Sequence, residues 1–257
     1  MLKNENWKDY EILRLQNGNK IERFGQYTVK RPESNAHHKN EVSMICDSEF
    51  NGKNWTNELK PWIIEYKDLK FQLETGKFKH VGLFPEQADN WDWMRKILKE
   101  TKDARILNLF AYTGAATIAA AREQAKEIVH VDALKSSIEA AKTNAKLNNV
   151  DDQYIRYMND DVIKFLKREV RRERQYTGII MDPPSFGRGP KGELWKIKDE
   201  LDQLIDLAVS RLVEGGEFLI INTYSNNLSK KDVERTLIKA LKKYNLPLNT
   251  KAYDLFL

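Results

Sequence analysis

The chain has 257 residues, enough for one large domain or for a domain with a smaller companion. Its 43 Lys and Arg against 38 Asp and Glu leave a net charge of +5, which permits a polyanionic partner without requiring one. The single cysteine, Cys46, excludes an intrachain disulfide framework. The sequence begins without the apolar core of a secretion signal, and no apolar run reaches the ~18 residues of a membrane span. We therefore expect a cytoplasmic protein with no membrane partner.

The first part of the chain has the alternating apolar and polar pattern of β-strands. Such runs lie at residues 10–15, 26–31, 62–66 and 69–74. Lys67 and Asp68 separate the last two runs and suit a tight hairpin turn. We expect residues 1–76 to form a small β-rich N-terminal domain.

A polar, Asn-rich stretch at residues 32–60 interrupts this pattern and predicts a long loop. It contains His37 and His38, which could suggest a metal site. Adjacent side chains point in different directions, and no cysteine or carboxylate sits at ligand spacing. We predict no metal here.

The rest of the chain, residues 77–257, alternates between strand and helix patterns. A helix starting near Pro85 should pack Trp91, Met94, Ile97 and Leu98 on a sheet. Strands are then predicted at 105–110, 128–132, 154–158, 177–182, 216–224 and 248–257, with a helix between each pair. Repeated β-α units with right-handed crossovers give an α/β fold with a doubly wound, mostly parallel sheet that binds ligands at its carboxyl edge.

The junction at residues 105–114, RILNLFAYTG, is the first candidate ligand site. A strand that turns directly into a helix offers free backbone N–H groups to an anionic ligand. Gly114 would leave room for that ligand, although a strand, a turn and an Ala-rich helix also pack well without one. We expect Gly114→Val to abolish ligand binding and to leave the protein folded.

Carboxylates follow three successive predicted strands. These are Asp132, Asp161 and Asp182. Asp132 lies roughly 20 residues past the glycine turn, where a ribose-binding acid belongs in a nucleotide-binding unit. That spacing fits NAD and S-adenosylmethionine equally well. The turn lacks the glycine triplet that accommodates a pyrophosphate, which disfavours a nicotinamide-dependent oxidoreductase, and two prolines freeze the backbone beside Asp182.

The segments NLFAYTG, HVD, DD and DPPSFGRGPKGELWKI resemble motifs of class I S-adenosylmethionine-dependent methyltransferases. Within that class they are similar to the bacterial group related to large-subunit ribosomal RNA methyltransferases, over about residues 78–224. The resemblance implies a Rossmann-like sheet of seven strands. It also implies that residues 108–114 wrap the methionine part of the cofactor and that Asp132 accepts both ribose hydroxyls.

By the same resemblance, Asp161 and Val162 contact the edge of the adenine ring. Gln87, which precedes the first strand of the α/β sheet in the sequence, also contacts the cofactor. The implied cofactor-binding residues are Gln87, Asn108, Phe110, Ala111, Tyr112, Thr113, Gly114, Asp132, Ala133, Asp161, Val162 and Asp182.

The implied catalytic residues are Asp182, Pro183 and Phe186. In related N-methyltransferases an acid or amide before two prolines accepts hydrogen bonds from an exocyclic amine, and a nearby aromatic ring stacks on the base. Here the aromatic residue falls one position later than in the common pattern. Cytosine-5 methylation needs a cysteine nucleophile, and Cys46 is remote in sequence from residues 222–225, where such relatives carry it. We predict that this is not a cytosine-5 enzyme.

Together these observations predict a methyltransferase acting on a base nitrogen in structured, ribosomal RNA. The stretch at 187–198, GRGPKGELWKIK, could reach phosphates, whereas the basic segment 164–174 fits a solvated helix face better than an RNA contact. The alternatives are methylation of a protein or small molecule, and an RNA-binding protein with a vestigial cofactor site. The sequence leaves the oligomeric state open.

Overall fold

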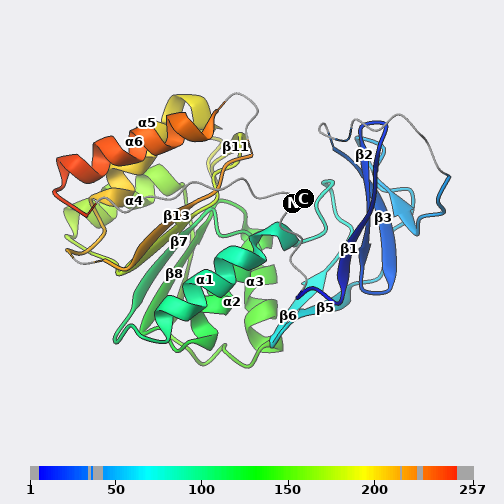
Figure 1. Ribbon diagram of the computed structural model, residues 1–257, viewed down its shortest axis with the longest axis horizontal. Helices are drawn as coiled ribbons and strands as arrows, with labels where there is room; N and C mark the ends of the chain where they lie inside the picture. Colours follow the sequence, from blue (N-terminus) through cyan, green and yellow to red (C-terminus); the bar gives the residue numbers. More distant parts are fainter. Residues whose placement is uncertain (1–5, 34–35, 37–42, 215, 225–227, 248–257) are drawn as a thin grey trace. The chain divides into compact units, whose positions relative to one another are not determined.

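The computed structural model describes residues 6–33, 36, 43–214, 216–224 and 228–247, which form two compact units (Figure 1). The first unit extends to Asp89 and the second starts at Asn90. The domain boundary inferred between residues 76 and 77 stays a prediction. Within these described ranges, no helix combines the length and apolar character needed to cross a membrane.

The N-terminal unit is built from β-strands. Its four-stranded sheet has the order β1 (Tyr10–Gln16), β2 (Asn19–Phe24), β3 (Tyr27–Pro32) and β4 (Ser48–Glu49). The hairpin of β5 (Trp62–Tyr66) and β6 (Leu69–Leu73) turns at Lys67 and Asp68, as predicted, and Lys67 takes the left-handed φ of 53° that such a turn requires. A short 3₁₀-helix, η1 (Pro85–Gln87), follows. The predicted loop contains β4, and His37 and His38 lie outside the described residues.

The second unit is a parallel α/β sheet. Its strands are β7 (Arg105–Leu109), β8 (Glu127–Asp132), β9 (Ile155–Asn159), β10 (Gly178–Met181) and β13 (Phe218–Ile221). They lie in the order β13-β10-β7-β8-β9, and every neighbouring pair is parallel. The doubly wound α/β fold is therefore confirmed. The described residues hold five of the seven predicted strands, and the stretch at 248–257 lies outside them.

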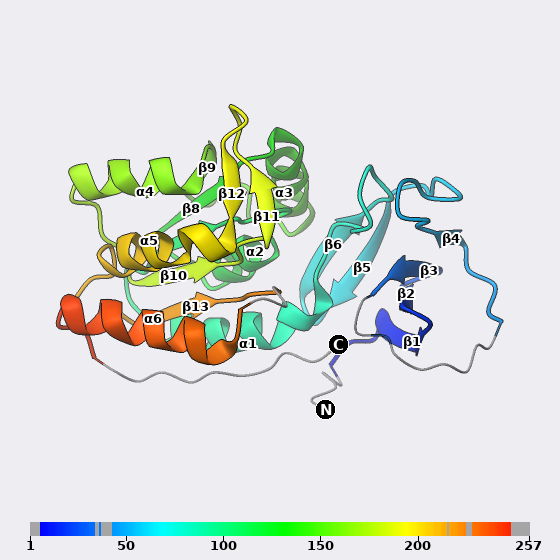
Figure 2. The same ribbon diagram turned by 90° about the horizontal axis from the view of Figure 1, so that it is seen from above.

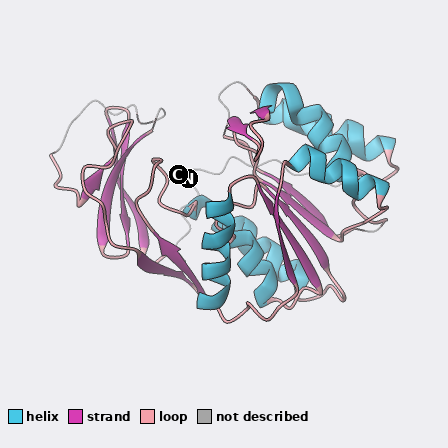
Figure 3. Ribbon diagram, turned by 180° about the vertical axis from the view of Figure 1, so that it is seen from behind, coloured by secondary structure: helices cyan, strands magenta, loops and turns pink. Residues whose placement is uncertain are grey.

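Helices cover both faces of this sheet (Figure 3). One face carries α1 (Ala88–Leu98), α2 (Ala115–Arg122) and α3 (Lys135–Leu147), and the other carries α4 (Val162–Arg171), α5 (Ile197–Val209) and α6 (Lys230–Lys243). Trp91, Met94 and Leu98 of α1 are buried, as the helical spacing predicted. Ser229 and Asp232 form a capping box at the start of α6.

An antiparallel hairpin interrupts the β-α alternation between β10 and α5. It consists of β11 (Phe186–Arg188) and β12 (Leu194–Lys196), and it stands out from the body of the second unit (Figure 2). The sequence at 187–198 predicted a loop. The apolar and polar residues alternate over too few positions here for the strands to be read from sequence.

Candidate active site

The candidate site lies at the carboxyl ends of β7, β8 and β10. The chain leaves β7 toward β8 through α2, whereas β10 lies on the other side of β7. The connections therefore diverge between β7 and β10, and in open α/β sheets ligands bind at such a switch point. The predicted motifs follow these three strands directly, so the fold places them along one edge.

The turn after β7 has an unusual backbone. Phe110, Tyr112 and Gly114 have left-handed φ values of 55°, 49° and 86°, which bulky residues rarely adopt. The N–H of Ala111 donates to the Val131 carbonyl at 3.1 Å, and this bond fastens the turn to the end of β8. Neighbouring strands thus hold the strained turn in a defined shape.

Asp132 ends β8 and is only 9% exposed. Its Oδ2 accepts the Tyr112 N–H and its Oδ1 accepts the Leu134 N–H, both at 2.8 Å. Burial raises the pKa of this carboxyl above its usual range, and the two N–H groups act in the opposite direction. Each carboxylate oxygen has two lone pairs, so each can still accept one further donor. Asp132 both orients the turn and can receive a pair of hydroxyls.

Gly114 is the N-cap of α2, and the space for a side chain at this residue is filled by the protein. A Cβ atom on this residue would lie 2.9 Å from Cβ of Ala141 in α3 and 3.5 Å from Cε1 of His130. The space it leaves is thus occupied by the protein. The expectation that Gly114→Val leaves the protein folded is wrong, because the new side chain would collide with α3 as well as strain the backbone.

A chain of neutral polar groups lies beneath the turn. Asn108 Nδ2 donates to Thr117 Oγ1 at 2.9 Å, and Thr117 Oγ1 lies 2.9 Å from His130 Nδ1. Asn144 Nδ2 donates to the Thr113 carbonyl at 2.9 Å. Burial lowers the pKa of His130 to about 3, so the ring is neutral. These side chains connect β7, β8, α2 and α3, and they support the turn from the sheet side.

The acceptor motif follows β10. The N–H of Asp182 donates to the Leu109 carbonyl at 3.3 Å, which sets the start of the motif beside the start of the cofactor turn. Pro183 is buried. The indole N–H of Trp195 donates to the Pro184 carbonyl at 2.6 Å, and its ring lies 4.9 Å from the Phe110 ring, centroid to centroid. Trp195 therefore joins the proline motif to the cofactor turn.

The sequence did not identify Trp195 and Leu134 as residues of the site. A single tryptophan among lysines and glycines was the available signal for Trp195. Leu134 follows Asp132 closely and is 47% exposed, an unusual position for a large apolar residue beside a buried acid. Nothing in the alternation of the sequence indicates that it is exposed.

The remaining predicted residues are distributed as follows. Phe186 lies on β11 and is 58% exposed, on the hairpin that Trp195 anchors. Asp161 caps α4 by accepting the Lys164 N–H at 2.9 Å, and the Val162 side chain is buried in the core under α4 and α5. Ala133 follows Asp132, and its carbonyl accepts Asn159 Nδ2 at 2.8 Å. Gln87 belongs to the N-terminal unit, in η1, so its role at the cofactor stays a prediction.

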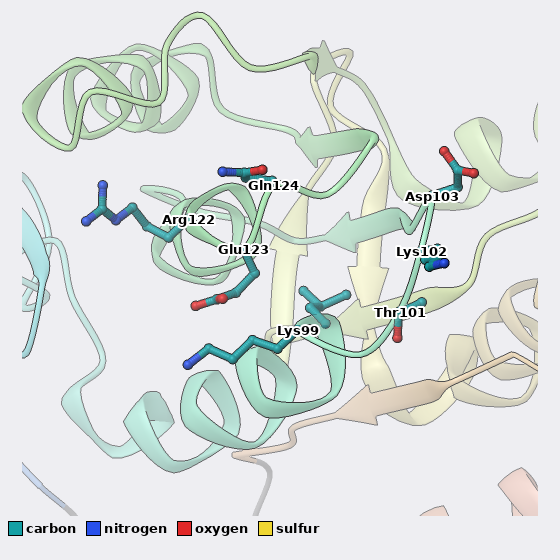
Figure 4. Close-up of a pocket in the computed structure, with 8 residues that line it drawn as sticks. Lys99, Thr101, Lys102, Asp103, Arg122, Glu123 and Gln124 are labelled. Carbon is teal, nitrogen blue, oxygen red and sulfur yellow. The ribbon is translucent and has the colours of Figure 1, made fainter.

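A second, polar depression lies at the opposite edge of the sheet (Figure 4). It is lined by the end of α1, the loop before β7 and the end of α2, through Leu98, Lys99, Thr101, Lys102, Asp103, Arg122, Glu123 and Gln124. This is the amino end of β7, away from the strand ends that carry the predicted motifs. We do not assign it a role in cofactor binding.

Known proteins that are similar to this chain include methyltransferases. A family model described as S-adenosylmethionine-dependent methyltransferase matches residues 38–228, and the chain belongs to this family. A solved S-adenosylmethionine-dependent methyltransferase from Agrobacterium tumefaciens is 32% identical, with a TM-score of 0.86 over 91% of this chain and 79% of that one. The cofactor is therefore S-adenosylmethionine, as predicted.

Curated relatives carry more specific names. Ribosomal RNA large subunit methyltransferase K/L of Pseudomonas aeruginosa is 31% identical over 171 residues, or 66% of this chain and 22% of that protein. Ribosomal RNA large subunit methyltransferase K of Neisseria meningitidis is 32% identical over 168 residues, or 65% and 46%. The chain thus spans less than half the length of these relatives.

The residues at the carboxyl edge fit S-adenosylmethionine. Asp132 offers a fixed carboxylate with room for two hydroxyl donors, and the exposed Leu134 offers an apolar surface for a flat base beside it. The backbone of the turn at 110–114, together with the start of α2, suits the charged amino-acid tail. These residues could hold the ribose, the base and the amino-acid tail of the cofactor.

Proposed function

We propose that this protein transfers a methyl group to a nitrogen of a base in structured RNA, with ribosomal RNA as the first candidate. One observation carries the proposal: the Asp182-Pro183-Pro184 motif and the cofactor turn leave adjacent strands, and the Asp182 N–H bonds to the Leu109 carbonyl. A group that receives a base amine therefore starts next to the group that holds the methyl donor. The names of the curated relatives support RNA as the acceptor.

The bound cofactor supplies a methyl group already activated on a positively charged sulfur. The protein's contribution is alignment and the exclusion of water, because no strong base is needed for such a transfer. The Asp182 carboxylate and the Pro183 carbonyl accept hydrogen bonds from an exocyclic amine and turn its lone pair toward the methyl group. Trp195 holds the backbone at Pro184, and Phe186 provides a ring for base stacking.

The thiol content of the chain supports a nitrogen acceptor over carbon 5 of cytosine. Cys46 belongs to the N-terminal unit, where burial raises the pKa of its thiol and makes it a poorer nucleophile. Residues 222–224, at the position where cytosine-5 relatives carry a cysteine, read Asn-Thr-Tyr. Asn222 is engaged in the fold, since its Oδ1 accepts Asn90 Nδ2 at 2.9 Å.

Mass spectrometry of nucleosides tests this proposal. Ribosomal RNA from cells lacking the gene is incubated with purified protein and cofactor carrying a deuterated methyl group. We expect one N-methylated nucleoside to gain the label, and Asp182→Ala to lose at least 100-fold in rate while its affinity for S-adenosylhomocysteine stays within threefold, on the order of what positioning contributes. A labelled 5-methylcytosine, or labelled protein with no labelled RNA, would contradict the proposal.

A further inference from the structure

The β11–β12 hairpin has two chemically different faces. In its register, Phe186 pairs with Lys196, Gly187 with Trp195, and Arg188 with Leu194. Paired residues in an antiparallel ladder share a face, and successive residues alternate between faces. Trp195 therefore points inward opposite Gly187, and the other four side chains form the outer face. We call Phe186, Arg188, Leu194 and Lys196 the hairpin face.

The hairpin face is held on a rigid base. The buried Trp195 binds the Pro184 carbonyl and packs against Phe110. Across the turn, the Gly189 N–H donates to the Glu193 carbonyl at 2.8 Å. Glu193 also accepts Lys164 Nζ from α4 at 2.5 Å, and this hydrogen bond lowers the pKa of its carboxyl to about 2. The hairpin is thus fastened both to the acceptor motif and to a neighbouring helix.

The composition of this face is unusual for a solvated surface. Phe186 is 58% exposed and Leu194 is 52% exposed, although both are large apolar residues. Each lies opposite a cation, and among the described residues neither Arg188 nor Lys196 forms an ion pair. Glu193, the acid of the hairpin, is already neutralised by Lys164. The face therefore combines apolar area with uncompensated positive charge.

The basic helix α4 provides a contrast within the same unit. Two of its four cations are matched: Arg168 pairs with Asp160, and Lys164 pairs with Glu193. Beyond its end, Arg172 pairs with Glu169 and Arg174 with Glu127. Charge density in the sequence is higher at α4, but the unmatched charge beside the acceptor motif is on the hairpin.

We infer that the hairpin face binds the single-stranded RNA segment that carries the methylated base. An aromatic ring between cations is the arrangement that binds unpaired nucleotides, because bases stack on the ring and phosphates approach the cations. A duplex keeps its bases stacked on one another and would not use Phe186. The inference rests on the proposed RNA substrate and adds the part of the protein that holds it.

Fluorescence anisotropy with a labelled ten-nucleotide single-stranded RNA and a labelled duplex tests the inference. Arg188→Glu/Lys196→Glu should weaken single-strand binding by about tenfold or more, because it reverses two phosphate contacts. Phe186→Ala should weaken it by about fivefold or more through lost stacking, with little effect on the duplex. The matched control is Lys167→Glu/Arg171→Glu, which makes the same charge change at exposed positions of α4 and should cost less than about threefold.

Unchanged S-adenosylhomocysteine affinity in the hairpin variants verifies that the unit is folded. Equal losses in both double variants would mean that only overall charge matters, and would overturn the inference. Wild-type protein that binds no single-stranded RNA would overturn it as well. If a hairpin variant binds RNA with normal affinity and still methylates it, the inference about the hairpin face is wrong and the proposed function stands. Hairpin-dependent binding without any methyl transfer would support the face and contradict the proposed function.

Discussion

Two buried polar clusters, one in each unit, are built in opposite ways. In the N-terminal unit, Glu22 is 0% exposed and accepts Arg31 Nε at 2.7 Å, Tyr10 Oη at 2.8 Å and Lys20 Nζ at 3.1 Å. In the second unit the buried polar chain under the cofactor turn, from Asn108 through Thr117 to His130, is neutral.

This difference separates two uses of buried polarity. A buried ion pair gains little net stability, because desolvation offsets the attraction, but breaking it leaves an expensive uncompensated charge. A neutral chain costs less to bury, and its hydrogen bonds still fix the orientation of the side chains. The charged cluster therefore favours one strand register in the small sheet, whereas the neutral chain shapes the turn that is proposed to bind the cofactor.

Removal of the central carboxylate charge should have the largest effect. Although burial opposes it, the charges of Arg31 and Lys20 hold the pKa of Glu22 below its usual range. We expect Glu22→Gln to lower the unfolding free energy of the N-terminal unit by about 3–5 kcal/mol, measured by hydrogen exchange over residues 10–32. Glu11→Gln, which loses only the exposed pair with Arg23, should cost less than about 1 kcal/mol. Similar losses in both variants would contradict the special status of the buried cluster.

The packing of the cofactor turn provides the next test. Gly114→Ala places a methyl group 2.9 Å from Ala141 Cβ at a φ of 86°. We expect a loss of about 2–4 kcal/mol in the unfolding free energy of the second unit, from backbone strain and overpacking together. Gly192→Ala has a similar φ of 85° but no atom within 4 Å, and should cost about 1 kcal/mol. If the two variants are equally stable, the contact with α3 does not constrain the turn.

A variant of Asp132 tests whether this buried carboxylate at the end of β8 binds the ligand. Its oxygens take one backbone N–H each, and Asp132→Asn replaces one acceptor with a donor that faces such an N–H. We expect the affinity for S-adenosylhomocysteine to fall by about 10- to 100-fold in calorimetry, as for a lost charged hydrogen bond. Asp206→Asn, at an exposed pair with Lys243, should leave that affinity unchanged. An unaltered affinity in Asp132→Asn would place the ribose site elsewhere.

The smallest effect concerns pH. Burial lowers the pKa of His130 from 6.5 to about 3, so between these values the unfolded chain binds a proton that the folded chain does not. The contribution of the neutral ring is complete above pH 6.5 and declines as the pH falls, by about 2 kcal/mol at pH 5.

Hydrogen exchange over residues 105–145, compared at pH 7 and pH 5, measures this loss. The segment separates His130 from His80 of the N-terminal unit, whose pKa burial also lowers to about 3. His130→Gln should lack the same decline. A wild-type protein and a variant with equal pH dependence would show that His130 is not the source.

Sequence patterns predicted elements well where side chains sort simply into apolar and polar faces. The alternating strands and helices between residues 105 and 243 are found as expected, apart from the β11–β12 hairpin, because their buried faces are apolar. The strand β2 was not among the runs named from the sequence. Its Lys20 and Glu22 look like solvent-facing positions, yet both are buried in the ion cluster. Arg31 on β3 and Tyr10 on β1 supply the partners that make that burial possible.

At the candidate site, the sequence predicted the individual motifs, because each is a contiguous segment. It did not predict the contacts between them. The sequence suggested Asp132 and Asp182 because each ends an apolar strand. The bonds from Trp195 to Pro184 and from Asn144 to Thr113 join residues 11 and 31 positions apart, and the segments between them carry no signal of either contact. The packing of Gly114 against α3 was likewise not visible in the sequence.

The sequence by itself determined the order of strands and helices, the lack of a glycine triplet in the turn and the acids at the strand ends, because these depend on local periodicity and spacing. The tertiary structure decided which polar residues are buried, which face of the hairpin is exposed and which cations are left unmatched. Those properties depend on neighbours that are distant in the chain. A lysine or arginine therefore stabilises the fold where an acid faces it, as at Lys164 and Arg168 of α4, and is available to a partner at the hairpin face.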